Sequence, residues 1–440
     1  MGSKSMLSYY LALALRSLKR SPVLSGLMVL AIGLGIGASM TMLTVLHVMT
    51  DDPLPGRSGN LYAPMIDPRP LSRSSAGQGA DDLPDGLTWP DAVNLLRAQR
   101  ADRQAAMSAG QMVMHPPGAD SHPFFEPGEF ASADFFAMFD VPFRAGSGWT
   151  TAQDDTHARV VVLNAGVARK LFGNASAIGR TVRLNDTDFR VIGVLDDWHP
   201  QPAFYQQAGE RIFGAADQVF LPLQTALELK FNFKGHLSCW GSGGDDRQSD
   251  HCLWLQFWAQ LDSRAKADAY RAFLADYWRD QQSHGRLPRP VHAQLFGLMD
   301  WLAHERVVPE DVRMQAWLAL GFLFVCMVNI TALLLAKFLR RGGEISVRRA
   351  MGARRRDIFI QFGIESALIG VAGGALGLLI AQAGLWSVRQ RPEGYAHLAQ
   401  MDLAMLCGTL TLAIITSLLA GLLPAWRACH VPPALQLKAS

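Results

Sequence analysis

The chain has 440 residues, of which 49% are hydrophobic, and its 41 Lys/Arg against 38 Asp/Glu give a net charge of +3. This charge is unevenly placed, because residues 49–313 carry 25 Lys/Arg and 33 Asp/Glu, a net of −8, and the remaining residues carry 16 and 5, a net of +11. The Arg clusters lie at the ends of apolar runs, which indicates a lipid bilayer as the partner and excludes a nucleic-acid-binding surface.

Residues 1–21 are predicted to form an amphipathic helix on the inner surface of the membrane. Apolar side chains recur at i, i+3 and i+4 spacing between Leu7 and Leu18, and basic residues crowd the end of the segment. The alternative is the charged leader of a cleaved signal peptide. The apolar run that follows is about twice as long as a signal-peptide core. It also lacks a small-x-small cleavage site before Asp51, so we expect it to be retained as a helix.

Four apolar runs are long enough, at roughly 20 residues, to cross a membrane as helices. The segment from Lys337 to Glu365, between the second and third runs, contains eight Lys/Arg and marks the cytoplasmic side. Both termini are therefore expected in the cytoplasm. The expected division is an interfacial helix (1–21), a first membrane helix (22–48), an outer domain (49–313), a second membrane helix (314–338), a cytoplasmic loop (339–361), a third membrane helix (362–386), a short outer loop (387–402), a fourth membrane helix (403–426) and a cytoplasmic tail (427–440).

Glycines interrupt the first and third apolar runs at spacings that favour close helix packing. Two GxxxG pairs overlap in the third run, and such pairs let helix backbones approach in lipid. We expect these glycines to pack helices within the chain or against another subunit. The candidate packing residues are Gly33, Gly37, Gly370, Gly373, Gly374 and Gly377.

The outer segment is predicted to be an α+β domain inserted between the first and second membrane helices. Residues 51–125 are rich in Pro, Gly, Asp and Ser and read as loops around one helix at 89–103. From residue 128 onward, short alternating strands mix with helices. The expected helices are 132–139, 163–172 and 265–282, and the expected strands are 160–163, 181–184, 189–195, 218–221, 254–261 and 291–296. A turn at Asn185-Asp186 is expected to join the strands 181–184 and 189–195.

Two of the five cysteines, Cys239 and Cys252, lie in the outer segment and bracket a Gly/Asp-rich loop. In an oxidising compartment such a pair favours a disulfide. The alternative is a zinc site from His236, Cys239, His251 and Cys252, which is disfavoured because adjacent residues of an extended chain point in opposite directions. The other cysteines, Cys326, Cys407 and Cys429, lie in or beside apolar runs and are expected to remain thiols.

The sequence contains no HExxH and no GxSxG pattern, and its histidines are scattered. We therefore expect no catalytic residues, although a membrane-anchored hydrolase stays open as a remote alternative.

Two stretches resemble known families. Residues 129–197, with the VVVL, ARKLFG and VIGV segments, look like the periplasmic core domain of MacB-type permeases. The membrane part resembles an FtsX-like permease in the string from Glu344 to Ala353 (EISVRRAMGA) and in the closing LPAWRA segment. The Pro/Gly-rich region 51–125 and the insertion 198–252 depart from the family pattern.

This resemblance implies a permease subunit of an ABC exporter in a bacterial inner membrane, with the outer domain in the periplasm. The implied partners are a cytosolic ABC ATPase, a second copy or a homologous permease, a periplasmic adaptor and an outer-membrane channel. The 440 residues contain no GxxxxGK[ST] loop, so ATP and Mg²⁺ are expected on a separate ATPase and no cofactor on this chain. The alternative is a signal transmitter that regulates an envelope enzyme or sensor.

By the same resemblance, residues 344–356 are expected to form the helix that docks on the ATPase. A positively charged loop that only contacts lipid headgroups is the alternative. The candidate coupling residues are Glu344, Arg348, Arg349, Met351, Gly352 and Arg354.

Overall fold

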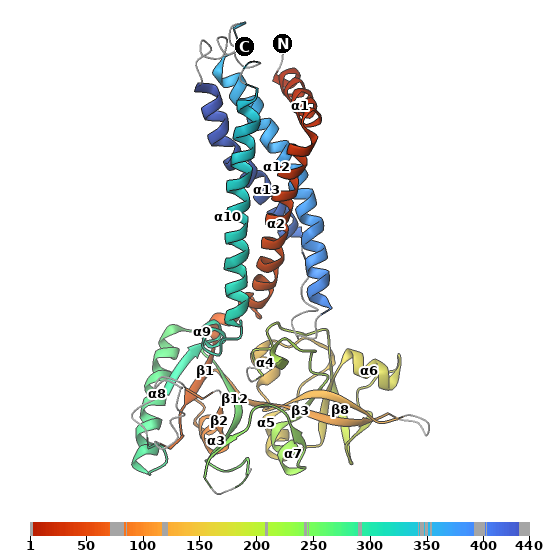
Figure 1. Cartoon of the computed structure of the whole chain (residues 1–440). Helices are drawn as coiled ribbons and strands as arrows, with labels where there is room; N and C mark the ends of the chain where they lie inside the picture. Colours follow the sequence, from red (N-terminus) through yellow and green to blue (C-terminus); the bar gives the residue numbers. More distant parts are fainter. Residues whose placement is uncertain are drawn as a thin grey trace. The chain divides into compact units, whose positions relative to one another are not determined.

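The computed structural model describes residues 3–70, 83–84, 86–116, 122–206, 210–241, 244, 246–288, 293–341, 343, 347, 351–352, 354–390, 401 and 403–430. The chain divides into two compact units (Figure 1). Residues 1–50 and 308–440 form the first unit, and residues 51–307 form the second. Each unit has its own cluster of buried apolar side chains.

The first unit is helical, and four of its helices contain stretches long and apolar enough to cross a membrane. α12 packs against α2 and α13, and α2 also packs against α10, so these helices run side by side in Figure 1. The helices of this unit are α1 (Ser3–Arg20), α2 (Pro22–Thr50), α10 (Glu310–Leu339), α12 (Arg355–Arg389) and α13 (Leu403–His430).

Two of these helices begin before the apolar runs do. The first turn of α10 contains Glu310 and Asp311. Acidic side chains there stabilise the helix, because they interact favourably with the positive end of its dipole. α12 begins at Arg355, and the Asp357 carboxylate accepts the backbone N–H of Arg354 at 3.2 Å. Both helices therefore start before the predicted membrane segments.

The second unit combines a mixed sheet with helices, which is the α+β class predicted for this segment. The strands are β1 (Leu61–Ile66), β2 (Leu87–Thr88), β3 (Arg103–His115), β4 (Phe124–Ala131), β5 (Phe143–Gly146), β6 (Val160–Asn164), β7 (Thr181–Leu184), β8 (Thr187–Leu195), β9 (Val219–Pro222), β10 (Asn232–Phe233), β11 (Ser238–Cys239), β12 (Cys252–Gln260) and β13 (Ala293–Gly297). The helices are α3 (Trp89–Ala98), α4 (Phe135–Phe139), α5 (Thr151–Asp155), α6 (Ala165–Phe172), α7 (Leu223–Glu228), α8 (Arg264–Ser283) and α9 (Leu298–His304), with 3-10 turns η1 (Ser58–Asn60) and η3 (Glu210–Phe213).

The main path through the sheet runs β13-β1-β12-β3-β4-β9-β6-β8-β5. The β4–β9 and β6–β8 pairs are parallel, and the other described pairs are antiparallel. β3 is the longest strand and pairs with β12, β4, β7 and β10, so it joins the two halves of the sheet.

The predicted helix at 89–103 was wrong at its C-terminal end. α3 ends at Ala98 because Gln99 adopts the left-handed conformation with φ 46°. β3 begins at Arg103, in a region predicted to be a loop. The sequence of β3 hides it, because Ala, Gly, Ser, Gln and Met replace the β-branched residues that usually mark a strand, and most of its residues are buried without alternation.

Two further helices begin later than predicted, at Phe135 rather than residue 132 and at Ala165 rather than residue 163. For α6 the cause is Asn164, whose side chain accepts the backbone N–H of Gly166 at 2.9 Å and so sets the first turn. The predicted hairpin at Asn185-Asp186 is confirmed, since β7 and β8 pair with Leu184 opposite Thr187.

Candidate functional site

The candidate site is the loop between α10 and α12 together with the helix ends that enter it. Of the six predicted coupling residues, Glu344, Arg348 and Arg349 lie outside the described residues. Met351 is 76% exposed, and its backbone N–H donates to Val347 O at 3.0 Å. Gly352 follows with φ +101°, a conformation that L side chains rarely adopt.

Arg354 ends this turn in an extended conformation and is the N-cap residue of α12. The described part of the segment therefore shows the Met351–Val347 hydrogen bond, a positive φ at Gly352 and the start of a long helix. A glycine at position 352 adopts this φ without strain.

Ten residues after the start of α12, the carboxylate of Glu365 is fully buried. Its Oε1 lies 2.7 Å from Lys337 Nζ, and its Oε2 lies 3.2 Å from an amino group of Arg341. Lys337 lies in the last turn of α10, and Arg341 lies two residues after its end. The hydroxyl of Ser17 in α1 also donates to the Glu365 carboxylate. One buried anion thus connects α1, α10 and α12.

Lys337 extends the cluster to a fourth helix, because its Nζ lies 3.3 Å from Ser25 Oγ in α2. Its side chain is only 5% exposed, so its charge depends on Glu365 for compensation. Removing one partner of a buried ion pair typically costs 3–5 kcal/mol, because it leaves the other charge uncompensated. This cluster, Ser17, Ser25, Lys337, Arg341 and Glu365, is called the charge cluster below.

From the sequence alone, the basic residues of the charge cluster were interpreted only as topology signals, and Glu365 was placed at the cytoplasmic edge of the third apolar run. A usable signal was present. An ionisable residue within a membrane segment is costly unless it has a partner, so Glu365 required a cation from a neighbouring helix. The sequence could not show which Lys or Arg supplies this cation.

The predicted packing glycines of α12 lie on two faces. A Cβ at Gly373 would collide with Ile32 of α2, and one at Gly377 would lie 3.2 Å from Ile36. On the other face, a Cβ at Gly374 would lie 2.7 Å from Ala413 of α13, and one at Gly370 would collide with Ser417. Each GxxxG pair therefore faces a different helix.

The α2 glycines complete the first of these contacts. A Cβ at Gly33 would lie 2.8 Å from Leu376, and one at Gly37 would lie 2.6 Å from Ile380. α2 and α12 therefore approach closely through small residues on both sides.

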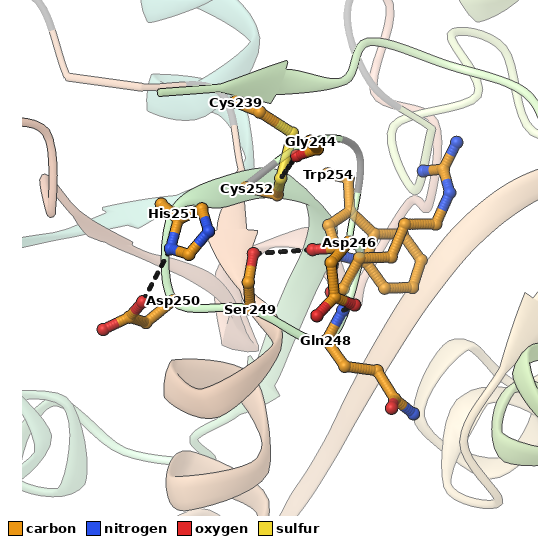
Figure 2. The surroundings of a disulfide bond; sticks show 10 residues. Cys239, Gly244, Asp246, Gln248, Ser249, Asp250, His251, Cys252 and Trp254 are labelled. Atoms are coloured by element: carbon orange, nitrogen blue, oxygen red, sulfur yellow. Dashed lines mark hydrogen bonds and ion pairs between the residues drawn. A yellow bond between two sulfur atoms is a disulfide. The ribbon is translucent and has the colours of Figure 1, made fainter. Parts of the chain in front are cut away.

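In the second unit, Cys239 and Cys252 are joined by a disulfide with an S–S distance of 2.03 Å (Figure 2). They lie opposite each other in the β11–β12 pair. The loop between them is folded against the sheet, because Trp254 Nε1 donates to Arg247 O at 2.7 Å and the Arg247 guanidinium lies 5.3 Å from the Trp254 ring. With both sulfur atoms in the disulfide, neither is a thiolate that could bind zinc, and Nδ1 of the neighbouring His251 lies 2.9 Å from Asp250.

Comparisons with known proteins match both parts of the chain. Residues 25–277 match the MacB-like periplasmic core domain, and residues 317–433 match the FtsX-like permease C-terminal domain. The pyoverdine export ATP-binding/permease protein PvdT of Pseudomonas aeruginosa is 25% identical over 342 residues, which cover 75% of this chain and 44% of that protein. The macrolide export ATP-binding/permease protein MacB of Salmonella typhi is 25% identical over 315 residues, 69% of this chain and 42% of that protein.

The chain thus spans less than half the length of these relatives. Among solved structures, the periplasmic region of MacB from Actinobacillus actinomycetemcomitans is 16% identical with a TM-score of 0.35, covering 56% of this chain and 94% of that one.

Proposed function

Since the chain belongs to the MacB-like family of ABC transporter permeases, we propose that it couples ATP hydrolysis on a separate cytosolic ATPase to movement of residues 51–307 for export. The ATPase docks on the loop between α10 and α12. Closure of the ATPase pulls this loop, and the long helices carry the displacement across the membrane.

The observation that carries this proposal is the buried contact of Glu365 with both Lys337 and Arg341. Lys337 lies in the last turn of α10, Arg341 lies just after that helix, and the chain returns at the start of α12. Because the charge cluster ties the C-terminal end of α10 to α12, a force on the loop moves α10 and α12 as one body rather than separating them. The Ser17 contact extends this body to α1.

The proposed orientation places the loop and both termini in the cytoplasm of a bacterium and residues 51–307 in the periplasm. The eight Lys/Arg between residues 337 and 365 support it, because positive loops are retained inside. The disulfide of the second unit supports it as well, because disulfides persist in oxidising compartments.

Dimerisation with a second permease is part of the proposal. Only 17% of the most apolar stretch of α10 is buried against other parts of the described chain. Trp317 and Phe324 on this helix are 76% and 61% exposed. Such an apolar surface suits contact with lipid or with a second permease copy. A periplasmic adaptor and an outer-membrane channel would complete the export path.

Charge reversal in the loop tests the docking step. Arg348 and Arg349, outside the described residues, are changed together to Glu, and the ATPase is co-purified with the permease from membranes. Losing charge pairs at a packed contact typically costs 2–5 kcal/mol, so we expect the ATPase to be lost. Insertion should persist, because Arg340, Arg341 and the 354–356 arginines still mark the inside. Unchanged co-purification of a correctly inserted variant would leave these arginines as topology signals only.

A further inference from the structure

The basic end of α1 stands directly before the apolar surface of α2. Ser21 alone separates the two helices, and Figure 1 shows α1 leading straight into α2. The backbone N–H of Ser25 donates to Ser21 O at 3.0 Å, so the first turn of α2 starts at this residue. Side chains at the end of α1 and at the start of α2 therefore belong to one short stretch of surface.

Three exposed cations lie within the last five residues of α1, namely Arg16, Lys19 and Arg20. Residues 1–20 contain four Lys/Arg and no Asp/Glu, so α1 itself supplies no compensating charge. Within the part of the chain that the structure describes, none of these three side chains has a hydrogen bond or an ion pair.

The neighbouring helix does not supply an anion to these cations either. α1 packs against α12, but both carboxylates of α12 are already engaged. Asp357 accepts the backbone N–H of Arg354 at 3.2 Å, and Glu365 pairs with Lys337 and Arg341. The charge of α1 therefore favours an anion from outside the described chain.

Contacts on its buried face hold α1 in place. Ala14 is fully buried, and Ser17, which is 2% exposed, donates its hydroxyl to the buried Glu365 carboxylate. Because α1 is fastened to α12 in this way, its three cations are presented at a fixed position rather than on a freely moving tail.

An exposed apolar stripe on α2 begins three residues after Arg20. Its four side chains are between 41% and 75% exposed, and their spacing places them on one face of the helix: Val23, Leu27, Leu30 and Leu34. At about 1.5 Å per residue, the stripe is about 16 Å long. Half of a hydrocarbon core that is roughly 30 Å thick has nearly the same length. The stripe therefore matches the acyl chains of one leaflet.

We propose that Arg16, Lys19 and Arg20 bind the phosphate of an anionic phospholipid whose acyl chains lie on the stripe from Val23 to Leu34. Arg and Lys make strong charge-assisted hydrogen bonds to phosphate. A zwitterionic lipid also carries a cationic group, so three uncompensated cations favour a lipid without one. In the proposed orientation of the chain, this lipid belongs to the cytoplasmic leaflet.

Site-directed photocrosslinking in lipid nanodiscs tests this site without any ATPase present, so its outcome is independent of the docking step. The photoreactive amino acid p-benzoylphenylalanine replaces Leu27 in the full-length protein. The nanodiscs contain equal amounts of phosphatidylglycerol and phosphatidylcholine, and mass spectrometry of the crosslinked protein counts the two lipids. One Lys or Arg near an anionic headgroup favours it about fivefold, so we expect phosphatidylglycerol to exceed phosphatidylcholine at least fivefold at this position.

The same probe at Leu379 of α12 gives the baseline, because this side chain is 68% exposed and lies ten residues or more from every Lys and Arg along the chain. We expect nearly equal yields of the two lipids there. Crosslinking at Leu379 also confirms that each variant is inserted. A lipid ratio at Leu27 that equals the ratio at Leu379 would overturn the proposal.

Arg16→Gln with Arg20→Gln removes two of the three cations, and we expect it to lower the lipid ratio at Leu27 roughly fivefold or more. The matched control is Arg340→Gln with Arg356→Gln, which removes two exposed arginines that flank the loop between α10 and α12. This control should keep the wild-type ratio. An equal loss in both variants would mean that general positive charge attracts the lipid without a site, and an unchanged ratio in the first variant would also overturn the proposal.

Discussion

Glu365 and Lys337 form an ion pair with 2.7 Å between Oε1 and Nζ, although their side chains are only 0% and 5% exposed. The two residues belong to different helices: Lys337 lies in the last turn of α10, and Glu365 lies ten residues after the start of α12. An ion pair so deeply buried makes each partner depend on the other.

The first prediction concerns the stability of this pair. Glu365→Gln leaves Lys337 and Arg341 without a compensating charge, and we expect it to lower the free energy of unfolding by about 3–5 kcal/mol. Replacing both partners, as Glu365→Gln with Lys337→Met, should recover part of this loss because no buried lysine charge remains. Thermal unfolding of the detergent-purified protein measures both effects.

Arg340→Met is the control for the lysine substitution, because Arg340 is exposed at the end of α10. A Glu365→Gln protein as stable as wild type, or a double variant with strictly additive losses, would show that the pair is not energetically coupled.

The second prediction concerns the glycine faces of α12. Gly373→Ala places a methyl group against Ile32 of α2, and overpacking of this kind typically costs 1–3 kcal/mol. Gly363→Ala on the same helix meets nothing within 4 Å and should be neutral or stabilising, because Ala favours a helix over Gly. Thermal unfolding of the two variants side by side checks this, and equal midpoints would refute the packing role of Gly373.

These helix contacts show where sequence reasoning succeeds and where it stops. GxxxG spacing could indicate that α12 packs closely, because the pattern is local. The partners of each face could not be predicted, since Ile32 and Ser417 lie far from α12 in the sequence. The same holds for Ser17 and Glu365, which are 348 residues apart.

In the second unit, the β7–β8 hairpin was predictable from its turn residues and alternating side chains. The strand β3 was not predictable, because its small and flexible side chains carry no strand signal. Its central place in the sheet depends on pairing with β12 on one edge and β4 on the other, which the local sequence does not show.

The third prediction concerns pH. Burial raises the pKa of Asp154 to about 7 from 3.8, so the folded state binds a proton here that the unfolded state has lost. The stability from this group is fully present below pH 4 and is lost as the pH rises through 7. Asp154→Asn should remove this dependence and be more stable than wild type at pH 8, on the order of 2–4 kcal/mol.

Thermal unfolding midpoints of the full-length wild-type and Asp154→Asn proteins between pH 4.5 and 8 measure this difference. Asp196→Asn serves as a control at an exposed carboxylate. Parallel curves for wild type and Asp154→Asn would mean that Asp154 ionises normally in the folded protein.

The fourth prediction concerns Cys239 and Cys252. The disulfide closes a loop with a sequence separation of 13 residues, and loop-closure entropy assigns such a crosslink about 3 kcal/mol. Replacing both cysteines by Ser should lower stability by roughly this amount. Mass spectrometry of unreduced peptides from the native protein should find the two joined, and two free thiols would contradict the pairing.

The central claim is that the charge cluster transmits motion from the loop to residues 51–307. The direct measurement is hydrogen exchange of these residues in the permease–ATPase complex, with ATP and vanadate and without nucleotide. We expect a nucleotide-dependent change in wild type and in the Arg340→Met control. In Glu365→Gln, the ATPase should stay bound and hydrolyse ATP while the change in residues 51–307 disappears. The same change in wild type and in a folded Glu365→Gln complex would contradict the claim.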